Sequence, residues 1–352
     1  MIFVISNKKA IEKNNDNCYN IVYIKGNNKC RITEKQVNYM DEKIQKLKDN
    51  IEKSIVGKED VIVKVIAALL CEGHILIEDV PGVGKTQLIS SLAKSLDGKF
   101  NRVQMTPDIM PSDIIGFSMI NQKTGELEYR PGAAMCNFLL ADEINRASPK
   151  SQSSLLEVME EGQISLDGKT HDLPKPFMVM ATQNPVETYG TYHLPEAQMD
   201  RFFMKISMGY PTAEEEIRII ERTEFGNPVE NVVRAVISLD DIADLQEHVK
   251  NVRVIPSVKK YITDIVRSTR DSEMVTLGVS PRGSITLYKA SKAIAFINGR
   301  DYVTPDDVKY IAECVLSLRV ILSVKGRTKY GTSEGFIRRI LEETPVPADA
   351  AN

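Results

Sequence analysis

Short apolar runs recur between residues 74 and 206, and polar residues follow most of them. Runs of about five apolar residues bounded in this way are typical of strands that are buried on both faces. Segments with helical spacing separate the runs, and this alternation predicts an α/β fold with a parallel sheet. The expected strands are 74–77, 100–105, 138–141, 177–181 and 202–206.

After residue 209 the pattern changes, because apolar residues recur there at spacings of three and four. Two helix starts are marked by capping pairs, Ser238 with Asp241 and Thr304 with Asp307. The chain is therefore expected to fold as an α/β core over 37–209 and a wholly helical domain over 210–352. The expected helices of the second domain are 214–225, 238–249, 256–270, 281–297, 304–322 and 333–342.

Residues 1–36 are rich in Asn and Lys and contain one weak strand pattern, at 21–24. We expect a variable, poorly ordered extension here in preference to a small functional domain. Met40 stands just before the first strongly helical segment, which begins at Asp41. Translation starting at Met40 is a hypothesis that the intact mass of the natively expressed protein would test.

Two β-hairpins are expected within the core. The first joins 119–120 to 127–129 through a turn that contains Gly125, and the second spans 163–173 and turns at Asp167-Gly168. The first hairpin interrupts the alternation of strands and helices, so we expect it to project toward a partner or a central opening.

A glycine-rich turn lies between the strand expected at 74–77 and a helix expected at 87–93. Its glycines allow backbone N–H groups to surround phosphate oxygens at a helix N-terminus, with Lys85 reaching the β- and γ-phosphates and the Thr86 hydroxyl holding Mg²⁺. Asp79 occupies the place of the pattern's first glycine, where Asp tolerates unusual backbone angles. The residues expected to bind ATP here are Asp79, Val80, Pro81, Gly82, Val83, Gly84, Lys85, Thr86 and Gln87.

Asp142 and Glu143 follow the apolar run 138–141, at the carboxyl end of an expected strand, where ligands bind in α/β sheets. Asp142 is expected to hold hydrated Mg²⁺, and Glu143 to orient or deprotonate the attacking water, a role worth about 10²–10⁴ in rate. Asn184 ends the strand at 177–181 and could position this water, although Asn-Pro is also a plain turn signal. Ile55 and Val56 are the expected lining of an adenine pocket.

Composition narrows the functional classes. The net charge of −3 disfavours a dedicated nucleic-acid binder. No apolar run approaches the roughly 20 residues that cross a bilayer. Five scattered cysteines without a CxxC spacing fit reduced thiols in a cytoplasmic protein.

Taken together, these motifs resemble the AAA+ ATPases, and most closely the MoxR family. The resemblance covers about residues 40–347 and is carried by 78–86, 138–147, 181–185, 194–202 and 278–282. It implies that Asn184 is a sensor aligning water with the γ-phosphate. It also implies that the helical domain over 210–352 is a lid and that Arg282 is a second sensor, which contacts nucleotide phosphates and couples the lid angle to the nucleotide state. It also implies that Arg201 is an arginine finger at a subunit interface. The alternatives are a local ion pair of Arg201 with Asp200, and a surface position for Arg282.

The resemblance further implies a cytoplasmic ring, a homo-hexamer, that uses ATP and Mg²⁺ to remodel or activate a partner protein. The partner implied is a von Willebrand factor A domain protein, and the task is maturation of complexes or metal insertion. Two departures from the family are visible: Leu318-Arg319 replaces the common His-Arg, and Gly283 replaces the usual Ala. The first is expected to alter the lid interface.

Two other functions would use the same motifs. One is a motor subunit of a magnesium-chelatase-like or nucleic-acid-remodelling machine, whose nucleic-acid version the acidic balance disfavours. The other is a scaffold that binds ATP but hydrolyses it weakly. The presence of Glu143, Asn184 and Arg201 argues against the scaffold.

Overall fold

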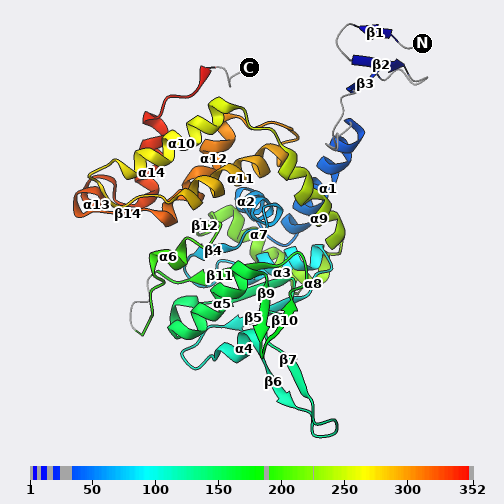
Figure 1. Ribbon diagram of the computed structural model, residues 1–352, viewed down its shortest axis with the longest axis vertical. Coiled ribbons are helices and arrows are strands. Elements are labelled where there is room, and N and C mark those ends of the chain that lie inside the picture. Colours follow the sequence, from blue (N-terminus) through cyan, green and yellow to red (C-terminus); the bar gives the residue numbers. More distant parts are fainter. Residues whose placement is uncertain are drawn as a thin grey trace. The chain divides into compact units, whose positions relative to one another are not determined.

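The computed structural model describes residues 3–5, 9–13, 19–23, 34–185, 190–224 and 226–348, with side chains from residue 42 onward (Figure 1). The chain divides into two compact units, 1–43 and 44–352, and each is considered by itself.

The first unit contains a three-stranded antiparallel sheet in the order β1-β2-β3, where one weak strand was expected. The sheet is followed by α1, which begins at Glu34 and so starts seven residues before the predicted helix. Residues 34–40 contain neither Gly nor Pro, so nothing in them stops the helix from extending backward. Helix α1 runs through Met40 and across the boundary expected at 36. The bounds are β1 Phe3–Ile5, β2 Lys9–Lys13, β3 Tyr19–Tyr23 and α1 Glu34–Glu52.

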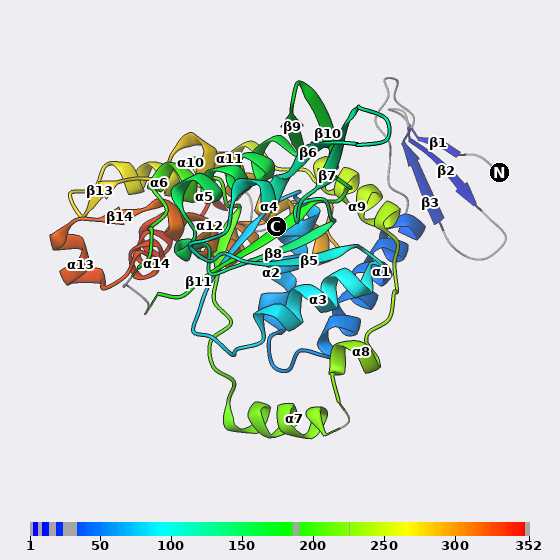
Figure 2. The ribbon, with the colours of Figure 1, turned by 90° about the horizontal axis from the view of Figure 1, so that it is seen from below.

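The second unit is built on a parallel five-stranded sheet in the order β12-β4-β11-β8-β5, and this confirms the predicted α/β core. Its inner strands are buried except for the last residue of each, because helices cover both faces, with α3 and α5 on opposite sides in Figure 2. The strands are β4 Ile75–Glu78, β5 Phe100–Gln104, β8 Phe138–Asp142, β11 Met178–Gln183 and β12 Met204–Ile206. The flanking helices are α2 Glu59–Leu70, α3 Lys85–Ser95 and α5 Pro149–Glu161.

Both predicted hairpins are present. Asp167 and Gly168 form the two-residue turn of the second hairpin and both have positive φ, as a type I′ turn requires. The first hairpin follows the short helix α4 and extends away from the sheet in Figure 1, with Phe117, Ile120 and Leu127 exposed. Its expected orientation toward a partner stays a prediction. The bounds are α4 Pro111–Ile115, β6 Gly116–Ile120, β7 Leu127–Pro131, β9 Gln163–Leu166 and β10 Lys169–Asp172.

The region after residue 209 is mainly helical, as expected, and both predicted capping boxes form. Ser238 Oγ accepts from the Asp241 N–H at 3.1 Å, and the Asp241 carboxylate accepts from the Ser238 N–H at 2.8 Å. None of the helices in the described residues is both long and apolar enough to cross a membrane. The helices are α7 Ala213–Thr223, α8 Pro228–Val232, α9 Leu239–Asn251, α10 Pro256–Arg270, α11 Pro281–Ile297, α12 Pro305–Leu316, α13 Val324–Tyr330 and α14 Ser333–Glu343.

One helix is shorter than predicted. The helix expected over 304–322 ends at Leu316, and a 3₁₀ turn, Ser317–Arg319, leads into the short strand β14 (Ile321–Leu322). This strand pairs antiparallel with β13 (Val275–Leu277), so the lid also contains a small sheet. The β-branched Val320 and Ile321 favour the extended backbone, and the Arg319 side chain is turned toward the α/β core.

Candidate active site

The turn between β4 and α3 adopts a conformation that depends on its glycines. Gly82 and Gly84 have φ values of +89° and +95°, which side-chain-bearing residues rarely adopt. Gly84 is the N-cap of α3 and provides no side-chain cap, so the first N–H groups of the helix are available to a ligand. The positive end of the helix dipole adds to this preference for an anion.

Asp79 anchors this turn, and the reason predicted for its presence is wrong. It is not among the residues with positive φ, so no unusual backbone angle has to be tolerated there. Its buried carboxylate accepts hydrogen bonds from Ser207 Oγ at 3.1 Å and from the backbone N–H groups of Met208 and Gly209. Asp79 therefore joins the start of the turn to the chain that follows β12.

A cavity of about 430 Å³ opens beside the turn. Segments from four neighbouring strands contribute to it, because parallel strands end at the same edge of the sheet. Lys85 lies in its wall, where the ammonium donates to the Asp79 carbonyl at 2.9 Å. The lining residues are Pro81, Gly82, Gly84, Lys85, Thr86, Gln87, Arg102, Gln104, Asp142, Glu143 and Asn184. Three of the residues of this turn that were predicted to bind ATP, Asp79, Val80 and Val83, are not part of this lining.

The two acids on the wall of the cavity are held by residues of β5 and β11. Asp142 accepts from the Thr182 hydroxyl and from Arg102, each at 2.6 Å. Thr182 in turn accepts the backbone N–H of Glu143 at 2.8 Å. Glu143 has a positive φ of 58°, a strained angle for this residue type, and it turns the backbone directly after the strand.

The Glu143 carboxylate receives hydrogen bonds from Gln104 at 2.9 Å and Arg146 at 3.0 Å. Sequence reasoning missed Arg102, Gln104 and Thr182. Arg102 and Gln104 are two residues apart on β5, so their side chains share one face of the strand, and Gln104 pairs in register with Asp142. The sequence shows that Arg102 and Gln104 lie two residues apart, but it does not show that β5 is the neighbour of β8, which places these side chains beside the acids.

The oxygen groups of the cavity fit a magnesium ion. Thr86 provides a hydroxyl and Asp142 a carboxylate in the same wall, and Mg²⁺ prefers oxygen ligands. Among the described residues no group of three His, Cys, Asp or Glu side chains could hold a metal by itself. A cation here would therefore depend on phosphate oxygens and water for its remaining ligands.

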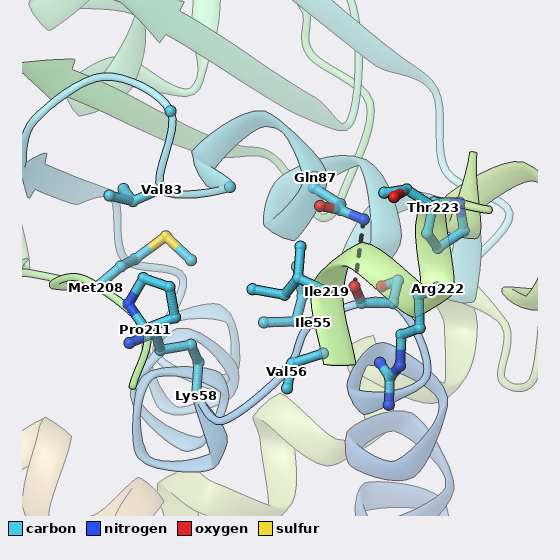
Figure 3. A pocket seen from close by; sticks show the side chains of 14 residues that line it. Ile55, Val56, Lys58, Val83, Gln87, Met208, Pro211, Ile219, Arg222 and Thr223 are labelled. Carbon is cyan, nitrogen blue, oxygen red and sulfur yellow. Dashed lines mark hydrogen bonds between the residues drawn. The ribbon is translucent and has the colours of Figure 1, made fainter. Parts of the chain in front are cut away.

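A second, smaller cavity of about 110 Å³ adjoins the first, and both are lined by Gly82, Gly84 and Gln87. The predicted Ile55 and Val56 lie in its wall together with Val83 and Met208 (Figure 3). Gln87 closes one side by donating to the Ser54 carbonyl at 3.2 Å. Helix α7 supplies residues that sequence reasoning missed, namely Ile219, Arg222 and Thr223.

The two predicted arginines lie outside both cavities. Arg201 and Arg282 share one acceptor, Glu160 on α5, at 3.1 Å and 3.0 Å. Asp200 does not pair with its neighbour Arg201, because Arg319 and Ser280 occupy its carboxylate at 2.6 Å and 2.9 Å. The structure thus brings Arg201 and Arg282 together, and their predicted contacts with nucleotide stay predictions. We call Glu160, Arg201 and Arg282 the arginine cluster.

Comparison with known proteins agrees with this geometry. Residues 74–204 match the model of the ATPase family associated with various cellular activities (AAA), and residues 267–339 match the AAA lid domain. The chain is 50% identical over 299 residues to the uncharacterized protein YeaC of Bacillus subtilis, which covers 85% of this chain and 93% of that protein. It is 40% identical over 306 residues to Chaperone MoxR1 of Mycobacterium tuberculosis, with 84% and 80% covered. A crystal structure of a candidate ATPase from Cytophaga hutchinsonii matches with a TM-score of 0.82 at 38% identity, covering 89% of this chain and 98% of that one.

Proposed function

The chain belongs to the MoxR family of AAA+ ATPases, and we propose that it binds ATP with Mg²⁺ and hydrolyses it in the larger cavity. One observation carries this proposal. Residues from separate segments of the chain, Lys85 and Thr86, Asp142 and Glu143, and Asn184, line the same cavity. The smaller adjoining cavity would take the adenine against Ile55 and Val56.

Each residue has a role that its position supports. The α3 N-terminus and Lys85 would bind the phosphates, while Thr86 and Asp142 would hold Mg²⁺, which offsets charge on the transferred phosphoryl group. Glu143 would take a proton from the attacking water, and Asn184 would orient that water. Gln104 and Arg146 hold the Glu143 carboxylate in the lining of the cavity, so the base is oriented before substrate arrives.

Hydrolysis is proposed to need a second subunit. AAA+ ATPases generally act as oligomers, and Arg201 lies outside the lining of its own two cavities. We assign it to the nucleotide of a neighbouring subunit, where an arginine stabilises charge on the transferred phosphoryl group. Arg282 lies on the same carboxylate as Arg201, which supports a phosphate contact at that same interface. A homo-hexameric ring is the proposed assembly.

The proposed task of the ring is to remodel or activate a partner protein in the cytoplasm. Support comes from the relative named Chaperone MoxR1, and the partner class we propose is a von Willebrand factor A domain protein. The exposed apolar side chains of the β6–β7 hairpin, among them Phe117 and Ile120, are a candidate contact surface for such a partner.

Substituting Glu143 tests the assignment. Glu143→Gln should retain ATP binding and lower the turnover rate by about 10²–10⁴-fold, because the amide keeps the size of the side chain but cannot accept the proton. The measurements are equilibrium binding of a fluorescent ATP analogue and phosphate release. Glu157→Gln, an exposed position on the neighbouring α5, is the matched control and should behave as wild type.

The same assay separates the rival functions. Normal turnover in Glu143→Gln would show that the catalytic base is wrongly assigned. A wild-type rate no higher than that of Glu143→Gln would favour the weakly hydrolysing scaffold. Stimulation by DNA or RNA, and not by a partner protein, would favour a nucleic-acid-remodelling motor.

A further inference from the structure

Arg319 is a buried cation at the contact between the lid and the α/β core. Its side chain is only 2% exposed, and most of its hydrogen bonds go to one short segment of the core, Asp200–Phe203. It donates to the Asp200 carboxylate at 2.6 Å and to the carbonyls of Asp200 at 3.2 Å, Phe202 at 2.6 Å and Phe203 at 3.4 Å. A further bond goes to the Val315 carbonyl in its own domain.

This segment is the one that carries Arg201. It connects α6 (Glu196–Met199) to β12, and Arg201 is the one residue of Asp200–Phe203 that accepts no hydrogen bond from Arg319. The backbone on both sides of Arg201 is thus fixed by a lid side chain, while the Arg201 guanidinium points elsewhere, to Glu160.

The same segment is tied to helix α11 of the lid. Ser280, the N-cap of α11, donates to the second carboxylate oxygen of Asp200 at 2.9 Å. Two residues later Arg282 binds the second oxygen of Glu160, whose first oxygen holds Arg201. Arg201 is therefore linked to the lid through its backbone and through its side chain.

Gly283 makes the position of Arg319 possible. A Cβ atom on this residue would lie 2.9 Å from Cδ of Arg319 and 2.3 Å from Cγ1 of Val279. Any side chain at 283 would displace the stem of Arg319 or the helix itself. Gly283, one of the two departures from the family pattern, thus lies against Arg319, the residue that this chain shares with the common His-Arg pair.

We propose that Arg319 is the positioning residue of Arg201: it fixes the segment Asp200–Phe203 so that Arg201 is presented to the neighbouring subunit and moves with the lid. This inference rests on the proposed role of Arg201 at a neighbour's nucleotide. Arg319 acts only through the segment and touches neither cavity of its own subunit.

Arg319→Lys tests the inference in rings of a single variant. Lys keeps the charge but lacks the planar fork that reaches several carbonyls at once. Turnover should fall by about 10–100-fold, less than the roughly 10³–10⁵-fold of losing a finger, with ATP affinity unchanged. Arg338→Lys, an exposed lid position paired with Glu313, is the matched control and should behave as wild type.

Mixed rings supply a readout that a merely structural role would not move. Arg319→Lys subunits are mixed with an excess of Glu143→Gln subunits, which retain only the residual turnover of that variant but present an intact Arg201. Turnover per Arg319→Lys subunit should then rise to that of wild-type subunits diluted into the same excess. Gly283→Ala, whose Cβ would press on Val279 and on the stem of Arg319, should show a smaller loss and the same rescue. It provides the test if Arg319→Lys does not fold.

Arg201→Ala in the same mixture distinguishes the positioning role of Arg319 from the proposed role of Arg201 at a neighbouring subunit. If Arg201→Ala is rescued and neither Arg319→Lys nor Gly283→Ala is, the positioning role of Arg319 is overturned while the proposed function stands. If Arg201→Ala is not rescued either, the proposed role of Arg201 in trans fails, and the inference fails with it.

Discussion

The larger cavity, which lies beside the turn between β4 and α3, and the arginine cluster are assembled in different ways. The cavity is lined by residues at the ends of adjacent parallel strands, so the sheet alone brings them together. The arginine cluster joins α5, the segment before β12 and the lid helix α11, and Arg282 belongs to it only because the lid is docked on the core. A change in lid position would therefore disturb the cluster and leave the walls formed by the strand ends in place.

The largest effects are expected from substitutions that remove one cation from each of the two regions. Lys85→Ala and Arg201→Ala should both abolish most turnover, by roughly 10³-fold or more for the finger. Only Lys85→Ala should also lose affinity for ATP, because Lys85 lines the cavity and Arg201 does not. Binding of a fluorescent ATP analogue and phosphate release measure the two properties separately.

Mixing these two variants provides the control. A Lys85→Ala subunit retains Arg201 and can serve the intact cavity of an Arg201→Ala neighbour, so mixed rings should regain part of the activity. Lys150→Ala, at an exposed position on α5, should leave binding and turnover unchanged. Equal loss of ATP affinity in Lys85→Ala and Arg201→Ala would contradict the separation of the two regions.

The contrast also explains what could be predicted from the sequence. The phosphate turn, the acids after β8 and Asn184 are each marked by a short contiguous pattern, and the sheet that unites them follows from alternating periodicity. Gln104 reaches Glu143 only because β5 pairs with β8 in the sheet, and a single sequence does not specify which strands are neighbours. Glu160 and Arg319 depend on how two domains dock, and their local patterns indicate only an exposed helix face and a helix end.

Thr182 links the two acids that line the larger cavity. Its hydroxyl donates to Asp142 and accepts from the backbone of Glu143, so it fixes the relative position of the two acids. Thr182→Val, which keeps the shape of the side chain, should lower turnover by about 10–100-fold, the usual effect of losing a residue that orients metal ligands.

The matched variant is Thr182→Ser, which retains the hydroxyl and should stay close to wild type. Steady-state phosphate release at several Mg²⁺ concentrations measures the effect, and Thr182→Val should require more Mg²⁺ for half-maximal rate. An unchanged Mg²⁺ dependence in Thr182→Val would show that the hydroxyl does not support the metal ligand.

His74 lies beside the C-terminal end of α5, the end that carries Glu160, and its expected effect is on stability and not on catalysis. Its ring accepts from the Val179 N–H at Nδ1 (3.0 Å) and donates from Nε2 to the Met159 carbonyl (2.8 Å), next to Glu160. Burial lowers the pKa of His74 to about 4 from its ordinary 6.5. The neutral ring fits both partners, whereas a protonated Nδ1 could no longer accept from Val179.

Since the folded-state pKa lies below the unfolded one, the unfolded chain binds the extra proton first. Stability contributed by His74 is complete above pH 6.5 and is lost as the pH falls toward 4, by about 2 kcal/mol between pH 7.5 and pH 5. His74→Phe should lower the free energy of unfolding at pH 7.5 by about 2 kcal/mol, because two buried backbone groups lose their partners. Its stability should then depend less on pH than that of wild type, as urea denaturation at the two pH values would measure. The control is His193→Phe, at an exposed position, which should keep the wild-type pH dependence. If His74→Phe loses as much stability on acidification as wild type does, the acid sensitivity arises from other groups and not from His74.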